Sequence, residues 1–497
     1  MSSLGQLIAR LKEMLIKRPS VETKATASIT EPPDSPEALP SPEPEHSQEQ
    51  AIAHAVQPHE APPERTPRAA RKAATRRAAS AARRRQSEKA RVIVGCDYGT
   101  HSTKVLYRRR GEERIRLAQI GKPCKGYPEC ASPSLIRIKD DRITFGRQAV
   151  GGREGERFAS LKVHLLRGDT AAANDLPKAA TVLNAVYLAW VFTEVRSIVE
   201  KEFPSADITF QVAAPIDYAG YVDQSEIKRR FQAVTQAAWK VAFDPGAENQ
   251  LSLRRGGSLG RACDVVQRLL EEPLLPESES PCQILPETVA PIVALALDPE
   301  MEPGIYLMVD MGAGTTEMSV VNSTANADGD VATCYYDSTI EIGGDKFSQA
   351  AAIKDTAVID GLLYQLERQA TVVHHSGFTK VLKNPVARRQ WDELTVVLTG
   401  GGTRRDDVAS IFRNPLSRRF GAHLRQFGIQ SFVLDGPRIN LDTNSLGISA
   451  SEARYLVVAR GLLVEQPRWP LTFLPHEVTA LESDNTQTAE RRPHWDQ

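Results

Sequence analysis

The sequence predicts an α/β fold with two lobes behind a long N-terminal tail. From Val92 onward, short apolar segments alternate with helical patterns, which is typical of α/β proteins. Two of the apolar segments end in similar Asp-containing, glycine-rich turns about 210 residues apart, as duplicated halves would. With 497 residues, the chain is also long enough for two sizeable cores, at about 100–200 residues per domain.

The tail divides into three segments that differ in charge. Residues 1–18 place leucines at helical spacing with basic residues between them, which predicts an amphipathic helix that docks on a membrane surface or in a partner groove, or else a marginal helix that begins a disordered tail. Residues 19–64 are rich in Pro, Glu and Ser and are expected to be disordered. Residues 65–91 are rich in Ala and Arg and form a linker or a basic helix with non-specific affinity for anions.

Composition narrows the class of protein. The 62 basic and 62 acidic residues cancel, and because the tail is basic the rest of the chain is acidic, so sequence-specific nucleic-acid binding is not expected. The six scattered cysteines do not form a disulfide framework, which favours a reducing compartment. The longest apolar run, 182–192, falls short of the roughly 20 residues of a membrane span. We expect a cytoplasmic protein, peripheral to a membrane if residues 1–18 dock there.

The elements follow from the apolar pattern. In the first lobe, residues 92–300, we expect strands and one long helix, at 91–97, 102–108, 113–120, 182–199 and 208–213. Residues 240–282 are rich in Gly, Pro and Glu and are expected to be an insertion with a short helix. In the second lobe, residues 301–470, we expect three strands and a last helix, at 305–310, 317–321, 395–399 and 451–464. A polar tail, 471–497, follows.

Three segments share one construction, an apolar strand that runs into a turn of small residues: 92–105, 306–321 and 395–405. Glycine lets the backbone approach a phosphate, whose oxygens then accept hydrogen bonds from N–H groups and Thr hydroxyls. Asp97 and Asp310 end the first two strands and are suited to hold the water shell of Mg²⁺. Neither the P-loop nor the Rossmann glycine pattern occurs at these turns.

These segments resemble the superfamily of actin, sugar kinases and DnaK-type heat-shock chaperone ATPases. Residues 92–105 and 306–321 resemble its two phosphate loops, and 395–405 its adenosine loop. Residues 283–295 and 449–461 resemble its two connecting helices. Further segments look most like the DnaK-type chaperones: 133–136, 143–149, 160–166, 212–215 and 341–347. The resemblance implies an actin-like pair of ribonuclease-H-like lobes that bind ATP or ADP with Mg²⁺ in the cleft between them.

The resemblance also implies roles by position. Asp97 and Asp310 would hold Mg²⁺ through water, Lys162 would reach the γ-phosphate, and Glu287 would orient the attacking water. The phosphates would be cradled by Gly99, Thr100, Gly312, Gly314 and Thr315. Gly343 and Gly344 would approach from the second lobe. The nucleoside would lie on Gly400, Gly401 and Gly402, with Arg404 beside the adenine. Lys104, seven residues after Asp97 as in actins, is a second candidate for the phosphate lysine.

The chain departs from the family pattern at several positions. His101 stands where Thr or Ser is usual and is expected to face solvent, while Glu317 replaces an Asp. Leu456 and Val457 stand where the second connecting helix has small residues. About 30 polar and Pro-rich residues follow the last helix, too few for a peptide-binding domain, so client refolding by the usual mechanism is not expected. His374 and His375 are expected in a surface loop, not in a metal site.

Three functions remain open at this point. The first is a weak, Mg²⁺-dependent ATPase that acts as a conformational switch for a protein partner or co-chaperone. The second is an actin-like filament or segregation ATPase tethered through residues 1–18, which Lys104 favours. The third is a scaffold that binds nucleotide without hydrolysing it, which His101 and Glu317 suggest.

Overall fold

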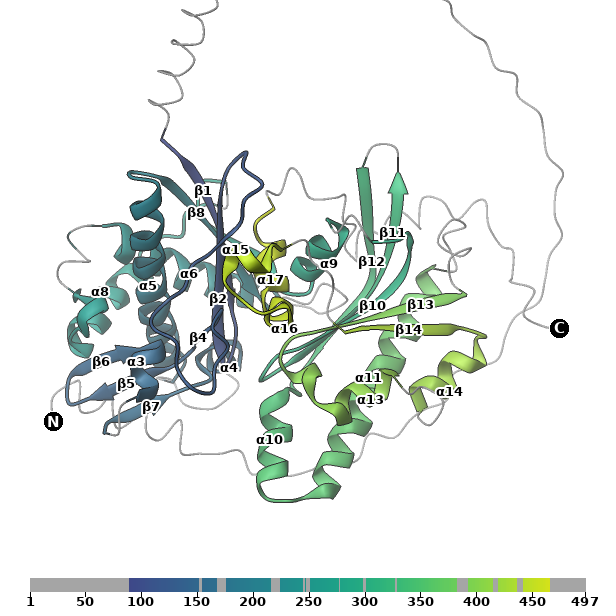
Figure 1. Ribbon diagram of the computed structural model, residues 1–497. Helices are drawn as coiled ribbons and strands as arrows, with labels where there is room; N and C mark the ends of the chain where they lie inside the picture. The colour runs from purple at the N-terminus through teal and green to yellow at the C-terminus, as the bar shows by residue number, and fades with distance from the viewer. Residues whose placement is uncertain are drawn as a thin grey trace, which may run out of the picture. The chain divides into compact units, whose positions relative to one another are not determined.

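The fold is a mixed α/β architecture with two main sheets (Figure 1). The computed structural model describes residues 89–464 except for short gaps, at 152–153, 168–175, 216–223, 245, 247–250, 277, 298–300, 327–328, 382–391, 414–418 and 436–440. The expected helix at 1–18, the linker up to residue 88 and the polar tail at 471–497 lie outside the described residues.

The first sheet has the strand order β3-β2-β1-β8-β9, with β4 beside β2. Its strands are β1 (Arg91–Tyr98), β2 (Ser102–Arg109), β3 (Arg116–Leu117), β4 (Ser132–Pro133), β8 (Asp207–Ala214) and β9 (Cys282–Pro286). β1 pairs antiparallel with β2 and parallel with β8, and β8 is parallel to β9. Seven of the eight residues of β1 are buried, because layers of helix or chain cover both faces of this strand.

The second sheet repeats this design. Its order is β12-β11-β10-β13-β14, and β10 again pairs antiparallel with β11 and parallel with β13. Its strands are β10 (Gly304–Met311), β11 (Thr316–Asn326), β12 (Gly329–Ile340), β13 (Glu393–Thr399) and β14 (Gln430–Asp435). The register repeats as well, because Asp97 lies across from Lys104 and Asp310 lies across from Glu317. The sequence expectation of an α/β fold is confirmed.

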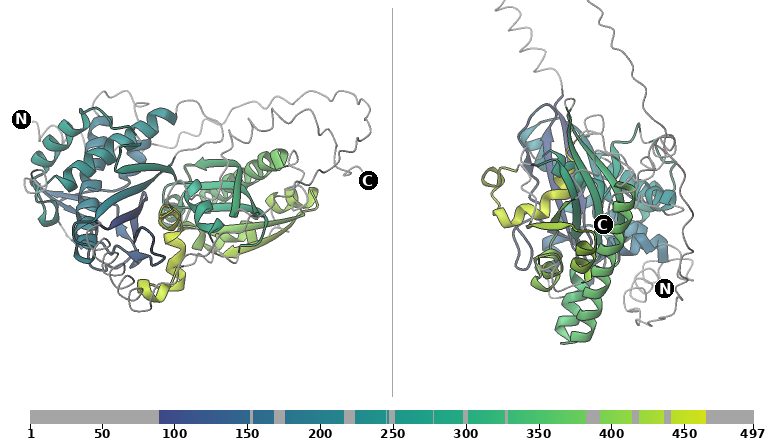
Figure 2. Two further views of the ribbon diagram at one scale, coloured as in Figure 1. Left: turned by 90° about the horizontal axis from the view of Figure 1, so that it is seen from above. Right: turned by 90° about the vertical axis from the view of Figure 1, so that its right-hand side faces the viewer.

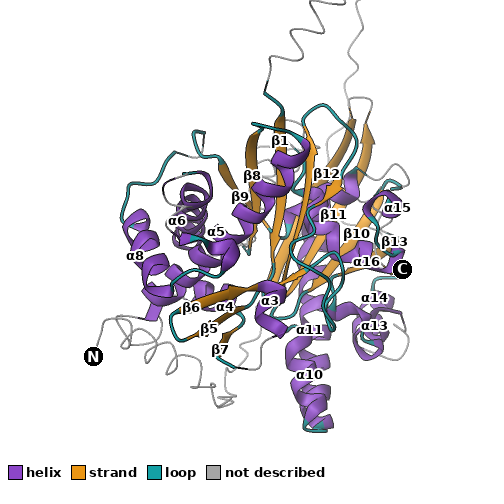
Figure 3. Cartoon of the chain, turned by 60° about the vertical axis from the view of Figure 1, so that its left-hand side comes forward, coloured by secondary structure: helices purple, strands orange, loops and turns teal. Residues whose placement is uncertain are grey.

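Helices cover both sheets. One side of the first sheet carries α5 (Leu176–Glu202), α6 (Gln224–Phe243) and α8 (Leu259–Leu270) (Figure 3). A small sheet and two short helices adjoin it: β5 (Ile136–Lys139), β6 (Arg142–Phe145), β7 (Glu156–Phe158), α3 (Gly146–Gly151) and α4 (Leu161–Arg167). The helices of the second sheet are α10 (Gly344–Ala352), α11 (Thr356–Val381), α13 (Asp406–Arg413) and α14 (Arg419–Gln426).

One helix has the length and apolarity of a membrane span among the described residues. It is Ala180–Glu202, within α5, and most of it is buried in the protein. Its apolar residues include Phe192, which stacks on Phe210 of β8. A buried core helix can have the same length and apolarity, so this helix is only weak support for a membrane span.

Two helices lie between the sheets (Figures 1 and 2). They are α9 (Val289–Ala296) and α17 (Val457–Gly461), which pack on each other. Their closest approach is at Gly461, where a Cβ would lie 1.7 Å from the carbonyl oxygen of Ala290. Leu456 and Val457 stand where small residues are usual, and they are buried in the core beside the first sheet. The small residue of α17 at the crossing is Gly461, further along the chain than expected.

Five other expectations differ from the structure. The expected strand at 113–120 is reduced to the two residues of β3, and the last helix is broken into α16 (Ala450–Ala453), a 3-10 turn at 454–456, and α17. Residues 251–270 are integrated into the core, because Leu251, Leu253 and Leu259 are buried. Residues 283–295 begin as strand β9 and become helical only at Val289. His374 lies buried in the helix α11, not in a surface loop.

Candidate functional site

The first glycine turn links β1 to β2. Its backbone is tight, because the Gly99 N–H donates to the Asp97 carbonyl at 3.2 Å and a Cβ on Gly99 would lie 2.5 Å from the carbonyl oxygen of Ser102. Ser134 braces the turn by donating to the Gly99 carbonyl at 2.6 Å. Asp97 is buried, and its Oδ2 accepts from Lys104 Nζ at 2.8 Å. The turn therefore presents a fixed carboxylate–lysine pair at the end of β1.

The second turn links β10 to β11 and receives the start of α10. The Gly312 N–H donates to the Thr315 carbonyl, and the Gly344 N–H donates to the Gly312 carbonyl, both at 2.9 Å. A Cβ on Gly343 would lie 2.2 Å from the carbonyl oxygen of Ala313. Glycine at 343 thus lets the N-terminus of α10 lie directly against this turn.

The third turn follows β13. Gly400 has φ +78°, a left-handed conformation that favours glycine, and a Cβ there would lie 2.4 Å from Oδ1 of Asp310. Gly402 packs against Met311 in the same way. At the rim, Arg404 Nη1 donates to the hydroxyl of Tyr455 at 3.2 Å, and the ring of that tyrosine covers Gly401. The strand β13 therefore brings the third turn against the end of β10.

The three turns converge. A Cβ on Gly314 would lie 3.1 Å from the Thr100 side chain, so the second turn meets the first although they belong to different sheets. A Cβ on Gly344 would lie 3.6 Å from the Cα of Gly402, so the start of α10 meets the third turn. Backbone from three distant parts of the sequence thus surrounds one place.

Charged side chains gather at the same place. Lys162, from α4, donates to Oε2 of Glu287 at 2.5 Å, and this pair is almost fully buried. Lys104 feels Asp97, Asp310 and Glu287: burial alone would lower its pKa, but these carboxylates raise it above the ordinary value. Four carboxylates, from Asp97, Glu287, Asp310 and Glu317, therefore face two lysines.

Two of these carboxylates have strongly raised pKa values. Loss of solvation inside the protein raises the pKa of Asp310 to about 7, although its side chain keeps some contact with solvent. The negative charges of Glu287 and Asp97 raise this pKa further. Burial, with Glu287 and Asp310, raises the pKa of Glu317 well above its ordinary value. One carboxylate oxygen of Glu317 has no hydrogen-bond partner in the described part of the chain. Protons on these two carboxyl groups therefore relieve part of the repulsion between the four acidic side chains, which do not form a direct metal-ligand cluster among the described residues.

Most predicted site residues are brought together by these contacts. Asp97, Gly99, Thr100 and Lys104 come from the first turn, while Asp310, Gly312, Gly314, Thr315, Gly343 and Gly344 belong to the second turn and α10. The remaining members of the group are Lys162, Glu287, Gly400, Gly401 and Gly402. Arg404 lies at the rim, on Tyr455. His101 is exposed, as expected, and stacks on Tyr127 with ring centroids 4.8 Å apart.

Comparison with known proteins adds no assignment: no protein-family model matches the chain, and no curated protein matches it either. What the site can do therefore rests on its own geometry.

Sequence reasoning missed two residues of the site. Glu317 stood out only as a departure from the family pattern, yet it contributes a buried carboxylate. Its position across from Asp310, seven residues on, repeats the spacing of Asp97 and Lys104, and this signal could have identified it. Tyr455 was missed because only the folded chain brings it to Arg404.

A shallow hollow of about 540 Å³ lies elsewhere, where residues 139–142 meet residues 256–258. None of the predicted site residues lines it. The Asp141 carboxylate there is already engaged by the Ser258 hydroxyl at 2.5 Å and the Gly260 N–H at 3.0 Å. The hollow is thus a structural junction, and we assign no chemistry to it.

Proposed function

We propose that the chain is a DnaK-like, actin-superfamily ATPase that binds ATP with Mg²⁺ between its two duplicated halves and acts as a nucleotide-dependent switch. The observation that carries the proposal is the convergence of three glycine turns on two aspartates at equivalent positions of two equally ordered sheets. A single glycine turn would be weak support, but such turns facing each other across two sheets form a cradle for an elongated anion.

The residues fit a nucleotide with its metal. Backbone N–H groups and the hydroxyls of Thr100 and Thr315 are donors for phosphate oxygens, and Lys104 adds a positive charge. The four carboxylates would repel phosphates unless a cation lay between them, and oxygen ligands of this kind suit Mg²⁺. Asp97 and Asp310 would hold Mg²⁺ through water, and the ion would neutralise phosphate charge.

The pair of Lys162 and Glu287 fits the chemistry of phosphoryl transfer. A lysine stabilises the charge that develops on the transferred phosphoryl group, and a carboxylate orients the attacking water. Their mutual hydrogen bond holds both side chains in place beneath the turns. Hydrolysis by such a site is slow unless a partner accelerates it, which suits a switch more than a metabolic enzyme.

The link between the halves supplies the moving part of the proposed switch. The helices α9 and α17 cross with backbone nearly in contact at Gly461 and Ala290, and a crossing of small residues permits one half to turn on the other. A cytoplasmic protein partner or co-chaperone would respond to the nucleotide state. No peptide-binding domain is proposed.

An actin-like filament former is a second candidate, favoured by one observation. The edge strand β14 exposes Phe432 and Leu434, with 50% and 44% of their surfaces accessible, and an apolar edge strand is suited to contact another copy. Sedimentation of the full chain with and without ATP separates this candidate from a monomeric switch.

The deciding experiment measures ATP binding and Mg²⁺-dependent hydrolysis by the full chain. We expect Asp310→Asn and Lys162→Ala to abolish turnover, because each removes a charge from the proposed site. The matched control is Asp360→Asn, the same change at an exposed position of α11. Tight binding without turnover in every variant would support a nucleotide-locked scaffold. A chain that binds no nucleotide would overturn the proposal.

A further inference from the structure

The end of the first sheet that lies remote from the glycine turns is basic. β1 starts at Arg91, and Asp97 lies six residues on, so about 20 Å separates the two ends at roughly 3.3 Å per residue. The backbone N–H of Arg110 donates to the Arg91 carbonyl at 2.8 Å. The end of β2 and the turn toward β3, rich in arginine from 108 to 116, therefore lie beside the start of β1.

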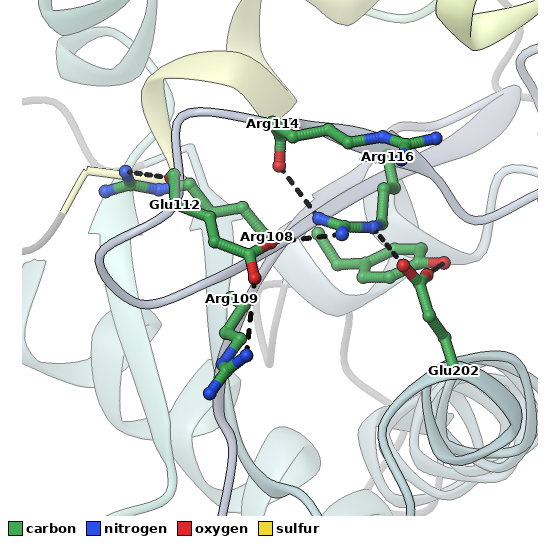
Figure 4. A network of polar contacts seen from close by, with 7 residues as sticks. Arg108, Arg109, Glu112, Arg114, Arg116 and Glu202 are labelled. Atoms are coloured by element: carbon green, nitrogen blue, oxygen red, sulfur yellow. Dashed lines mark hydrogen bonds and ion pairs between the residues drawn. The ribbon is translucent and has the colours of Figure 1, made fainter. Parts of the chain in front are cut away.

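Part of this charge is used to hold the turn in place (Figure 4). Arg116 bonds Glu202, at the end of α5, at 2.5 Å and Glu112 at 3.0 Å. Arg109 contacts Glu112 at 3.5 Å, and the hydroxyl of Tyr107 donates to Glu202 at 3.0 Å. Glu112 and Glu202 are thus already neutralised, and the arginine-rich turn is fixed on α5.

Other basic side chains of this end have no ion-pair partner within the residues that the structure describes: Lys89, Arg91, Arg114 and Arg460. Lys89, Arg91 and Arg114 are exposed, and in Figure 4 the guanidinium of Arg114 points away from the network. Arg460, in the last turn of α17, is more enclosed, and burial together with the nearby charge of Arg108 lowers its pKa to about 10. The exposed carboxylates nearby, Glu113 and Asp207, offset only part of this charge.

The sequence before residue 89 is basic as well. Residues 65–91 hold eleven Lys or Arg against one Glu, and the last of them, Lys89 and Arg91, belong to the basic end of the sheet. Further upstream, residues 1–18 place leucines at helical spacing among four basic residues. Basic charge attracts anionic headgroups, and an amphipathic helix adds apolar insertion. A duplex nucleic acid would use the charge but not the leucines.

We propose that the basic end of the first sheet, with Lys89, Arg91, Arg114 and Arg460, docks on an anionic lipid bilayer. Because the glycine turns lie at the opposite end of β1, they face away from the bilayer in this orientation. The inference goes beyond the proposed function, since it requires no nucleotide.

The test is flotation of the full chain with vesicles of phosphatidylcholine, alone or with about 30% phosphatidylserine. The variant Lys89→Glu with Arg114→Glu changes two exposed residues outside the strands. The control, Arg261→Glu with Arg268→Glu, makes the same charge change on exposed positions of α8. We expect the first variant to bind anionic vesicles at least about tenfold more weakly, because it loses two basic residues that each contribute about 1 kcal/mol near the surface. The control should bind like the wild type.

Several outcomes would overturn the proposal. Equal binding by the two variants would mean that the folded part does not face the bilayer. Equal binding to neutral vesicles would mean that apolar insertion alone carries the contact. Retention of a DNA duplex by the wild type, lost in the first variant, together with no binding to anionic vesicles, would assign the surface to nucleic acid. Thermal unfolding of both variants verifies that their folds are intact.

Discussion

Glu317 is a site residue whose surroundings disfavour its charged form. It is buried and faces the carboxylates of Glu287 and Asp310, and the charge of Lys162 offsets only part of their effect on its pKa. A carboxyl group with a raised pKa keeps its proton in the folded state over a pH range in which the unfolded chain has lost it. The free energy of unfolding therefore falls as pH rises above the ordinary glutamate value. The repulsion around Glu317 therefore lowers the stability of the fold in this pH range.

The substitution Glu317→Gln tests this residue. It keeps the shape and removes the charge, so we expect the ligand-free protein to gain about 1 kcal/mol at pH 8 and to lose less stability between pH 5 and 8 than the wild type. Thermal unfolding across this pH range is the measurement. Glu393→Gln, at an exposed position of β13, is the control and should leave the profile unchanged. A profile for Glu317→Gln that matched the wild type would show that Glu317 is not under charge strain.

At the scale of elements, α11 and α14 are joined through histidines. His374 Nδ1 lies 3.0 Å from His423 Nε2, and burial, with the charges of His423 and His375, lowers the pKa of His374 to about 3. A histidine with a lowered pKa stays neutral in the fold while the unfolded chain takes up a proton below about pH 6.5. The contact between these helices is thus weakened by acid.

We expect His374→Leu to change the acid sensitivity of unfolding. At pH 8 the variant should lie within about 2 kcal/mol of the wild type, because leucine fills the site but loses the hydrogen bond. As pH falls from 6.5 toward 4, the wild type should lose stability faster than the variant. Urea unfolding at several pH values measures this. His375→Gln, at the exposed neighbouring position, removes only the smallest cause of the lowered pKa of His374 and should retain most of the acid sensitivity of the wild type.

The elements next to the glycine turns were predictable, and those fixed by distant partners were not. β1, β10 and β13 combine an apolar run with a small-residue turn, so two signals agree for each. The segment 113–120 alternates like a strand, but the chain pairs only at 116–117, where β2 offers partners. The burial of His374 depends on His423, far along the chain, which no local pattern indicates. For the site, the turns gave the backbone cradle, while the Lys162–Glu287 pair required the fold.

For the whole molecule, the crossing of α9 and α17 joins the two halves. At Gly461 the backbones nearly touch, and Gly95 of β1 also packs closely against α17, because a Cβ there would lie 2.4 Å from the Ala459 carbonyl oxygen. Side chains of α9 reach the cores of both sheets, since Ile292 packs with Tyr306 and Met308, and Ala290 packs with Ala213. A substitution at this crossing would therefore disturb the packing of both sheets.

Gly461→Ala tests the crossing against a matched change. The new Cβ would lie 1.7 Å from the Ala290 carbonyl, so α9 must shift, and we expect a loss of about 2–4 kcal/mol in unfolding free energy. Gly361→Ala, in α11, meets no atom within 4 Å and should be neutral or stabilising by up to about 1 kcal/mol. Urea unfolding measures both. Equal effects would mean that the crossing tolerates displacement.

The shared register of the two hairpins has one more consequence. A doubled architecture offers two copies of the same hairpin, yet the position across from the aspartate is Lys104 in one copy and Glu317 in the other. This difference places a lysine paired with Asp97 on one side of the place where the turns meet, and a buried carboxyl group with a raised pKa beside Asp310 on the other. The side chains therefore give this place a direction that two matching backbones alone would leave undetermined.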